Sequence, residues 1–345
     1  MENIKNQKGL GYLMKELKDD FKKKQFKPVY LLYGEEPYLV RHYTGMFAEK
    51  LLEGADAMMN RDTFEGKETD IDSMIDAANT LPFLSDWRLV YVKDSHLLTT
   101  GRKDATEKLA TYLPTLPDTT ILVFVENTID KRNRLYKKIV ELGRVVECKI
   151  PGESELIRWI GNVFKKKGKE IPAEAVRQLI ATVPCNMDTI YAEADKLAGF
   201  VGERTTITTN DIRDVCTQSL EARIFELVAA VCGGKTEKAL VQYHNMLIMK
   251  EQPLMVLTMM ARQFRMVLQC KVCAEKNMTP NAISDILGIQ GFIVRECLKQ
   301  SLNFTASRLL QALSDCQDTD TRIKSGLLDD KIGVELLIVR YSVMA

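Results

Sequence analysis

Hydrophobic and polar positions follow two different patterns along the chain, and the pattern changes near residue 150. Before that point, short apolar runs alternate with stretches of helical periodicity. Continuous apolar runs are typical of strands that are buried on both faces of a parallel sheet. Three such runs occur, at residues 29–33, 89–92 and 121–125, and residues 144–148 are predicted to form a further strand. Strands that alternate with helices predict an α/β layer with a mostly parallel sheet over roughly residues 1–150.

After residue 150 the strand signals nearly vanish. Four short helices are predicted, at residues 154–167, 172–182, 187–199 and 209–216. Thr208 and Asp211 have the spacing of a capping box at the start of the last one. From about Ser219 onward, apolar stripes at helical spacing lie opposite Glu and Lys, which predicts a bundle of five to seven helices. The predicted fold class is therefore an α/β module, then a small helical domain, then an all-α bundle.

The first apolar run leads into a turn and a helical stretch, the order found in nucleotide-binding proteins with a phosphate loop. Such a loop needs G-x-x-x-x-G-K-[ST], so that backbone N–H groups and one Lys surround the phosphates. The turn at residues 34–37 is instead Gly-Glu-Glu-Pro. Its two carboxylates would repel a triphosphate, and Pro37 lacks a backbone donor. The segment indicates either a nucleotide-binding scaffold without nucleotide chemistry or an ordinary βα unit.

A short amphipathic helix is predicted over residues 70–79, with Asp70 as its N-cap. The segment that follows, TLPFLSDWR, links it to the strand at residues 89–92. Pro82 in this link disfavours helical geometry at the residue before it, so the chain leaves the helix there.

The link would project Leu81, Phe83 and Leu84 from a short turn. Connections run over the surface, and apolar side chains on a surface turn either tuck into the core or form a partner site. Physical reasoning alone favours the first interpretation, with Leu84 and Trp87 facing inward.

Length and composition narrow the function without identifying it. The 345 residues are enough for two or three domains, and 46% hydrophobic and 28% charged residues are typical of a globular protein. A formal charge of +1 disfavours a surface that binds nucleic acid throughout. No apolar run approaches the ~18 residues of a membrane span, and the amino-terminal segment lacks a signal-peptide core. A cytoplasmic location is the default expectation, with no membrane partner.

Chemistry-bearing residues do not form a recognisable site. The three histidines, His42, His96 and His244, have no metal-ligand spacing. The eight cysteines are scattered, and the close pair Cys270 and Cys273 has no second pair nearby, so all are expected to be reduced core residues. We predict no catalytic residue, no cofactor-binding residue and no metal ligand.

Two further segments bear on whether the chain could hydrolyse ATP. Asp70, Asp72 and Asp76 could line one side of a helix, but carboxylates near a helix start usually serve capping. The strand at residues 89–92 is followed by Lys93-Asp94, whereas an ATPase would place an Asp-Glu pair there to hold magnesium and water. The chain therefore lacks a second motif that an ATPase needs, in addition to the phosphate loop.

Several segments together resemble one family, the delta subunit of bacterial DNA polymerase III, which is the clamp-loader subunit that opens the sliding clamp. No single motif is diagnostic, but the order and spacing of the segments cover nearly the whole chain. They are VYLLYGEEPYLV (29–40), NTLPFLSDWRLVYV (79–92), NMDTIYAEADKLAGF (186–200), SLEARIFELVAAVCGGKTEKAL (219–240), MARQFRMVLQCK (260–271), LGIQGFIVRECLKQSLNF (287–304) and IKSGLLDDKIGVELLIVRY (323–341).

The resemblance implies a degenerate AAA+ module of two domains followed by a helical collar. The boundaries would be residues 1–148, 149–213 and 214–345. It also implies a non-hydrolysing subunit without a bound ATP or other cofactor and without a catalytic site of its own, so that DNA-directed DNA polymerase activity belongs to the holoenzyme.

The resemblance reverses the interpretation of the link. The family contacts the clamp through an apolar tip after a short helix, which by position falls on Leu81, Pro82, Phe83 and Leu84, with Phe83 the best match. The implied partners are the beta sliding clamp, the other loader subunits (the tau/gamma-type ATPases and the delta-prime type) through the collar, and primed DNA within the assembled complex.

Two alternatives belong to other classes. Residues 279–300 have the length and central Gly of a helix-turn-helix in a transcription regulator, but apolar residues such as Phe292 and Ile293 dominate the second helix where polar groups should face the bases. A helical pair inside the bundle is favoured. An active AAA+ ATPase is disfavoured by both eroded motifs.

Overall fold

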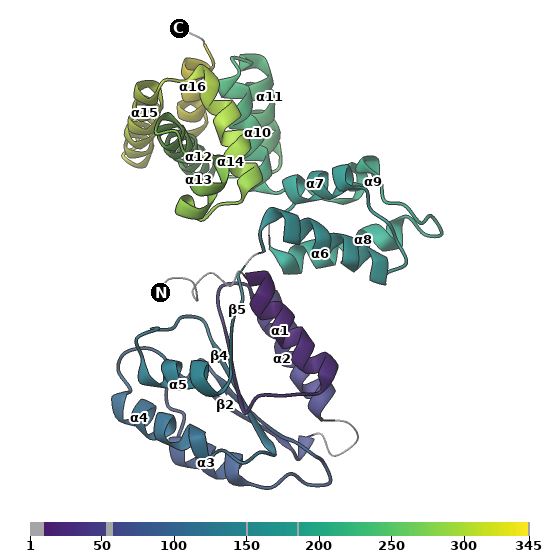
Figure 1. The fold of residues 1–345 in the computed structure, drawn as a ribbon. Helices are drawn as coiled ribbons and strands as arrows, with labels where there is room; N and C mark the ends of the chain where they lie inside the picture. Colours follow the sequence, from purple (N-terminus) through teal and green to yellow (C-terminus); the bar gives the residue numbers. More distant parts are fainter. Residues whose placement is uncertain (1–9, 53–57, 150, 185, 344–345) are drawn as a thin grey trace. The chain divides into compact units, whose positions relative to one another are not determined.

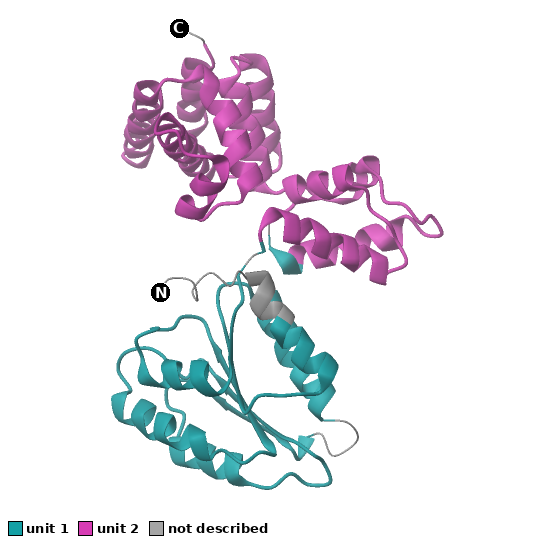
Figure 2. Cartoon of the chain, in the orientation of Figure 1, with its two compact units in different colours: residues 1–151, 186–188 teal, residues 152–185, 189–345 magenta. Residues whose placement is uncertain are grey.

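A computed structural model describes residues 10–52, 58–149, 151–184 and 186–343, with side chains from residue 16 onward. Contacts divide the chain into two compact units, coloured in Figure 2. The first comprises residues 1–151 with 186–188, and the second comprises residues 152–185 with 189–345. The further division near residue 213 stays a prediction.

The first unit contains a five-stranded, entirely parallel sheet, which confirms the predicted α/β layer. The strand order is β2-β3-β4-β1-β5. Strands β1, β3 and β4 are buried along nearly their whole length, as their apolar runs predict. The strands are β1 (Val29–Tyr33), β2 (Arg61–Glu65), β3 (Arg88–Lys93), β4 (Thr120–Glu126) and β5 (Arg144–Glu147).

Strand β2 was not predicted. Its sequence, RDTFE, has one large apolar residue, and none of its positions is buried. The strand lies at the edge of the sheet and pairs with β3 alone. Because no position of β2 is buried, the strand needs no continuous apolar run, so the signal that identifies the central strands is missing here.

Helices cover both faces of the sheet (Figure 1). Helices α1 (Leu10–Lys23) and α2 (Pro37–Leu51) lie on one face, where the Phe47 ring packs against Phe21 and Tyr30 with centroids 4.8 and 4.7 Å away. The other face is covered by α3 (Ile71–Asn79), α4 (Lys103–Tyr112) and α5 (Arg134–Leu142). Asp70 caps α3 by accepting from the backbone N–H groups of Asp72 and Ser73, as predicted.

The described part of the second unit is entirely helical apart from one isolated bridge. Thr208 and Asp211 form the predicted capping box. The first four helices are α6 (Glu153–Lys166), α7 (Ala173–Thr182), α8 (Met187–Phe200) and α9 (Thr209–Val215). Seven more follow: α10 (Leu220–Cys232), α11 (Thr236–Ile248), α12 (Pro253–Glu275), α13 (Pro280–Leu287), α14 (Gly291–Gln300), α15 (Ala306–Lys324) and α16 (Asp330–Ser342).

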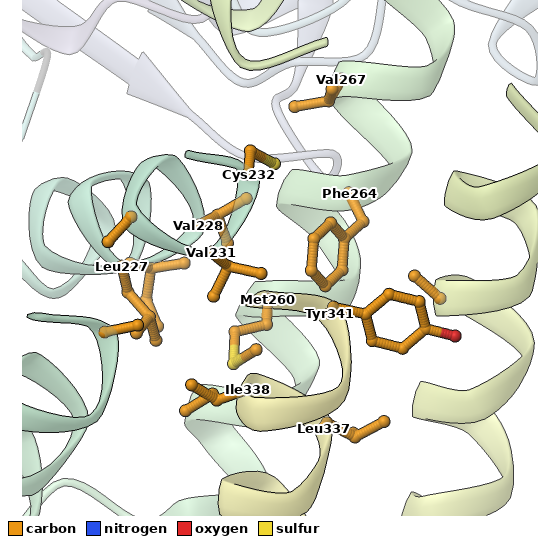
Figure 3. Packing of buried hydrophobic residues seen from close by; sticks show 14 of the residues in the cluster. Leu227, Val228, Val231, Cys232, Met260, Phe264, Val267, Leu337, Ile338 and Tyr341 are labelled. Carbon is orange, nitrogen blue, oxygen red and sulfur yellow. The ribbon is translucent and has the colours of Figure 1, made fainter. Parts of the chain in front are cut away.

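Helices α10–α16 enclose one hydrophobic core, which confirms the predicted bundle (Figure 3). Met260 and Phe264 of α12 lie at its centre beside Val231, Ile338 and Tyr341. All of these residues are at least 95% buried. Throughout the described ranges, none of the helices is both long enough and apolar enough to cross a membrane.

The helix pair at residues 279–300 belongs to this bundle. Ile283 of α13 and both Val294 and Cys297 of α14 are completely buried in the common core. The exposed Arg295 donates to both carboxylate oxygens of Glu153, at 2.8 and 2.6 Å. One face of each helix therefore packs into the bundle core, as the favoured interpretation predicts.

Candidate partner-binding site

The link between α3 and β3 displays three large apolar side chains to solvent. Leu81 is 76%, Phe83 52% and Leu84 80% exposed. Pro82 between them is half-buried. We define these four residues as the tip. The expectation that Leu84 faces inward is wrong, because its backbone adopts a left-handed conformation (φ +48°) within the turn that leaves the side chain in solvent.

Trp87 at the other end of the link does face inward in part. It is half-buried, and its ring packs edge-on against Phe26 with centroids 5.8 Å apart. The link therefore begins at the end of α3, projects its apolar side chains, and is anchored again one residue before β3.

Asn60, directly before β2, fixes the backbone of the tip. Its side-chain amide donates to the Phe83 carbonyl at 2.8 Å and accepts from the Phe83 N–H at 2.6 Å. Asn60 is only 1% exposed, so its side-chain amide is shielded from water, and leaving that amide unpaired would be costly. The position of Phe83 is therefore set by a residue 23 positions away.

Arg88 fixes the base of the same link. Its buried guanidinium donates from Nε to the Ala77 carbonyl at 2.6 Å and from Nη2 to Asp62 Oδ2 at 2.5 Å. It also donates from Nη1 to the Met59 carbonyl at 3.5 Å. One side chain thus joins α3, β2, β3 and the segment before β2. These bonds fix the end of the link that carries the tip.

Replacing Asn60 with aspartate should destabilise the first unit. An ionised aspartate cannot donate to the Phe83 carbonyl and places a charge at a buried position, so we expect the free energy of unfolding to fall by about 1–3 kcal/mol. Urea denaturation of Asn60→Asp measures this loss. Asn245→Asp, on the exposed face of α11, is the matched control and should change little. Equal stability of the two variants would show that Asn60 does not support the tip.

The turn between β1 and α2 has a carboxylate where a phosphate would lie in a P-loop protein. Glu36 is 1% exposed, and its Oε1 accepts from the Tyr38 N–H at 3.1 Å, so it caps α2. Its Oε2 accepts from the Met187 N–H at 3.5 Å, and Met187 belongs to the same compact unit as Glu36. The free N–H groups and positive end of a helix N-terminus attract anions, and here the chain supplies the anion itself.

Gly34 begins this turn because no other residue fits. Its φ is +135°, and a Cβ atom there would lie 2.3 Å from the Cys148 carbonyl oxygen. The Glu36 N–H donates to that same oxygen at 2.9 Å. The turn is therefore packed tightly against the end of β5.

The neighbouring turn after β3 is also closed by an internal carboxylate. Glu126, 4% exposed at the end of β4, accepts from the Ser95 N–H at 3.0 Å and from the Ser95 hydroxyl at 2.5 Å. The His96 N–H adds a longer bond at 3.4 Å. Burial raises the pKa of the Glu126 carboxyl, while these bonds favour its ionised form. Nothing in the sequence pattern identified Glu126, because it ends an apolar run.

Asp72 forms an ion pair, and Cys148, Cys216 and Cys232 are buried thiols. Asp72 pairs with Lys108 on α4, and within the described ranges no group of three His, Cys, Asp or Glu could hold a metal ion. Burial raises the pKa of the Cys148, Cys216 and Cys232 thiols to about 12, so they are poor nucleophiles at neutral pH.

A second apolar surface lies on α16. Ile332, Leu336 and Val339, spaced as one face of a helix, are 51%, 58% and 39% exposed. The opposite face packs into the bundle core through Ile338 and Tyr341, among others. A helix that is apolar on both faces is typical of one that is buried on both sides, so this outer face is a candidate assembly surface.

Comparisons with known proteins agree on one family. The family model described as "DNA polymerase III, delta subunit" matches residues 30–149, and the model of the "DNA polymerase III delta subunit, C-terminal domain" matches residues 221–341. DNA polymerase III subunit delta of Bacillus subtilis is 28% identical over 326 residues, which cover 92% of this chain and 94% of the relative.

Two further matches extend this result. A probable DNA polymerase III subunit delta of Aquifex aeolicus is 21% identical over 302 residues, covering 85% of each chain. The solved structure of the Bacillus subtilis DNA clamp loader delta protein superposes with a TM-score of 0.70 at 27% identity, covering 95% of this chain and 98% of that one. The similarity therefore extends along nearly the whole chain and is not limited to one domain.

Proposed function

Because the chain belongs to the family of DNA polymerase III delta subunits, we propose that it binds the sliding clamp and opens it for loading onto primed DNA. The observation that carries this proposal is the tip. Three exposed apolar side chains stand on a backbone fixed by Asn60 and Arg88. A rigid apolar projection is costly in water and useful only when a partner covers it.

The mechanism that we propose is mechanical. Phe83 and Leu81 enter an apolar pocket on the clamp, and the surface near α3 distorts an adjacent clamp interface. Burying two such side chains contributes roughly 3–6 kcal/mol before the costs of association. That is enough to favour one open state of a ring, whereas release needs a second conformation that hides the tip. ATP binding by other loader subunits would supply that switch.

Membership of the family implies assembly with other clamp-loader subunits. We assign this contact to the bundle α10–α16 as a collar, and its candidate surface is the outer face of α16. In the assembled complex the chain would lie close to primed DNA, in the cytoplasm. Polymerase activity would belong to the holoenzyme, and this subunit would contribute no catalytic group.

The chain should neither bind nor hydrolyse ATP. The Glu36 carboxylate lies at the N-terminus of α2, where it would repel a phosphate, and Lys93 stands where an ATPase would hold magnesium. Calorimetric titration with Mg-ATP should therefore give no binding heat, with an ATPase subunit of the same loader as the positive control. Micromolar binding, or turnover that survives removal of contaminating ATPases, would support the active-ATPase alternative.

A pull-down of the purified full-length chain against the sliding clamp of its own organism tests the proposal. A delta subunit should retain the clamp, and a transcription regulator should ignore it. Helices α13 and α14 each pack one face into the bundle core, which supports a helical pair of the bundle over a recognition helix.

A further inference from the structure

Two methionines outside the tip are strongly exposed in the first unit. Met58 is 80% and Met59 64% exposed, immediately before Asn60. Neither residue belongs to the link between α3 and β3. Exposed apolar side chains scattered singly need no explanation, but a group of them gathered at one place does.

The structure joins the segment that carries these methionines to the tip. Asn60, the next residue, holds Phe83 through its side chain and accepts from the Leu89 N–H at 2.9 Å through its carbonyl. The Met59 carbonyl accepts from Arg88, which anchors the link. Strands β2 and β3 are parallel neighbours, so the segments that precede them emerge at the same edge of the sheet.

We infer that Met58 and Met59 form a second contact with the same sliding clamp that the tip binds. The inference rests on the proposed function and extends it to residues outside the link. Asn60 and Arg88 join both segments, so a partner seated on Phe83 meets the methionine segment as well. Methionine is flexible and polarisable, which suits a contact that must adapt while the ring changes shape.

Oxidation of the methionines measures the contact without any substitution. Dilute hydrogen peroxide converts exposed methionine to the sulfoxide, and mass spectrometry of peptides gives the rate at each site. Saturating clamp should slow oxidation of Met58 and Met59 by about fivefold or more, since a buried thioether is shielded from peroxide. Met255 on α12, 51% exposed, is the internal control and should oxidise at an unchanged rate. Unchanged rates at all three sites with the clamp bound would overturn the inference.

Substitution provides the second measurement. Met58→Gln with Met59→Gln in the full-length chain should raise the Kd for the clamp about tenfold, since the side-chain length is kept and the apolar contact is lost. Met255→Gln is the control and should leave the Kd within about twofold. Thermal melting checks that each variant is folded.

The outcomes separate this inference from the proposed function. If Phe83→Ala weakens binding and the double methionine variant does not, the methionines are not part of the contact, although the proposed function stands. If the wild-type chain does not bind the clamp, both are wrong. Protection of Met58 and Met59 together with the tenfold loss supports both.

Discussion

Replacing Phe83 with alanine should weaken clamp binding by about 2 kcal/mol or more, roughly a thirtyfold rise in Kd. Truncating an aromatic anchor loses the transfer free energy of a ring that is buried only in the complex. The fold should be nearly unaffected, because Phe83 is 52% exposed and Asn60 holds its backbone atoms, which alanine keeps. Clamp affinity and melting temperature should be measured on the same variant.

A matched control shows whether the effect is local. Val140→Ala removes a side chain that is 53% exposed on α5, outside the link, and should leave clamp affinity unchanged. If Phe83→Ala instead lowered the melting temperature by many degrees and left affinity intact, the ring would belong to the core. The tip would then have no role in binding.

Cutting the chain between α9 and α10 should separate clamp binding from loader assembly completely. The predicted boundary at residue 213 falls inside α9, so the cut is better placed at residue 217, after the helix ends. The fragment of residues 1–217 keeps the tip, Asn60 and Arg88. The fragment of residues 218–345 keeps the whole bundle core, whose members run from Ile224 to Tyr341.

The first fragment should bind the clamp and fail to enter the loader, and the second should do the reverse. Size-exclusion chromatography of each fragment with the clamp, and separately with the partner loader subunits, measures both properties. Circular dichroism should first show that each fragment is folded. If residues 1–217 assembled as well as the full chain, the bundle would not be the collar, and the outer face of α16 would need another partner.

The parts of the fold that the sequence predicts are those whose signal is local. Strands β1, β3 and β4 are buried on both faces, so each is a continuous apolar run, and Asp70 caps α3 within three residues of itself. Strand β2 was not predicted because none of its positions is buried, so its sequence contains no apolar run. Leu84 was misplaced because nothing in the pattern of apolar residues indicates a left-handed turn conformation.

The candidate site depends even more on contacts between residues that are distant in the sequence. Resemblance to a family located the tip, but the residues that support it are distant in sequence: Asn60 lies 23 positions from Phe83, and Asp62 lies 26 from Arg88. Glu126 lies 31 positions from Ser95. Single polar residues of this kind carry no periodicity, and only the folded chain shows which partners they meet. The sequence indicates that the Glu36 carboxylate would repel a triphosphate. The structure shows in addition that Glu36 caps the N-terminus of α2.

Release of closed clamps from circular DNA without ATP tests the central claim most directly. If the chain opens the ring with its own binding energy, a stoichiometric amount should free labelled clamps from a nicked circular plasmid, as followed by gel filtration. The wild-type chain should release them in the absence of nucleotide, and Phe83→Ala should leave them on the circle. Clamps that stay on the plasmid with the wild-type chain, although the chain is bound to them, would contradict the proposal that this protein opens the clamp.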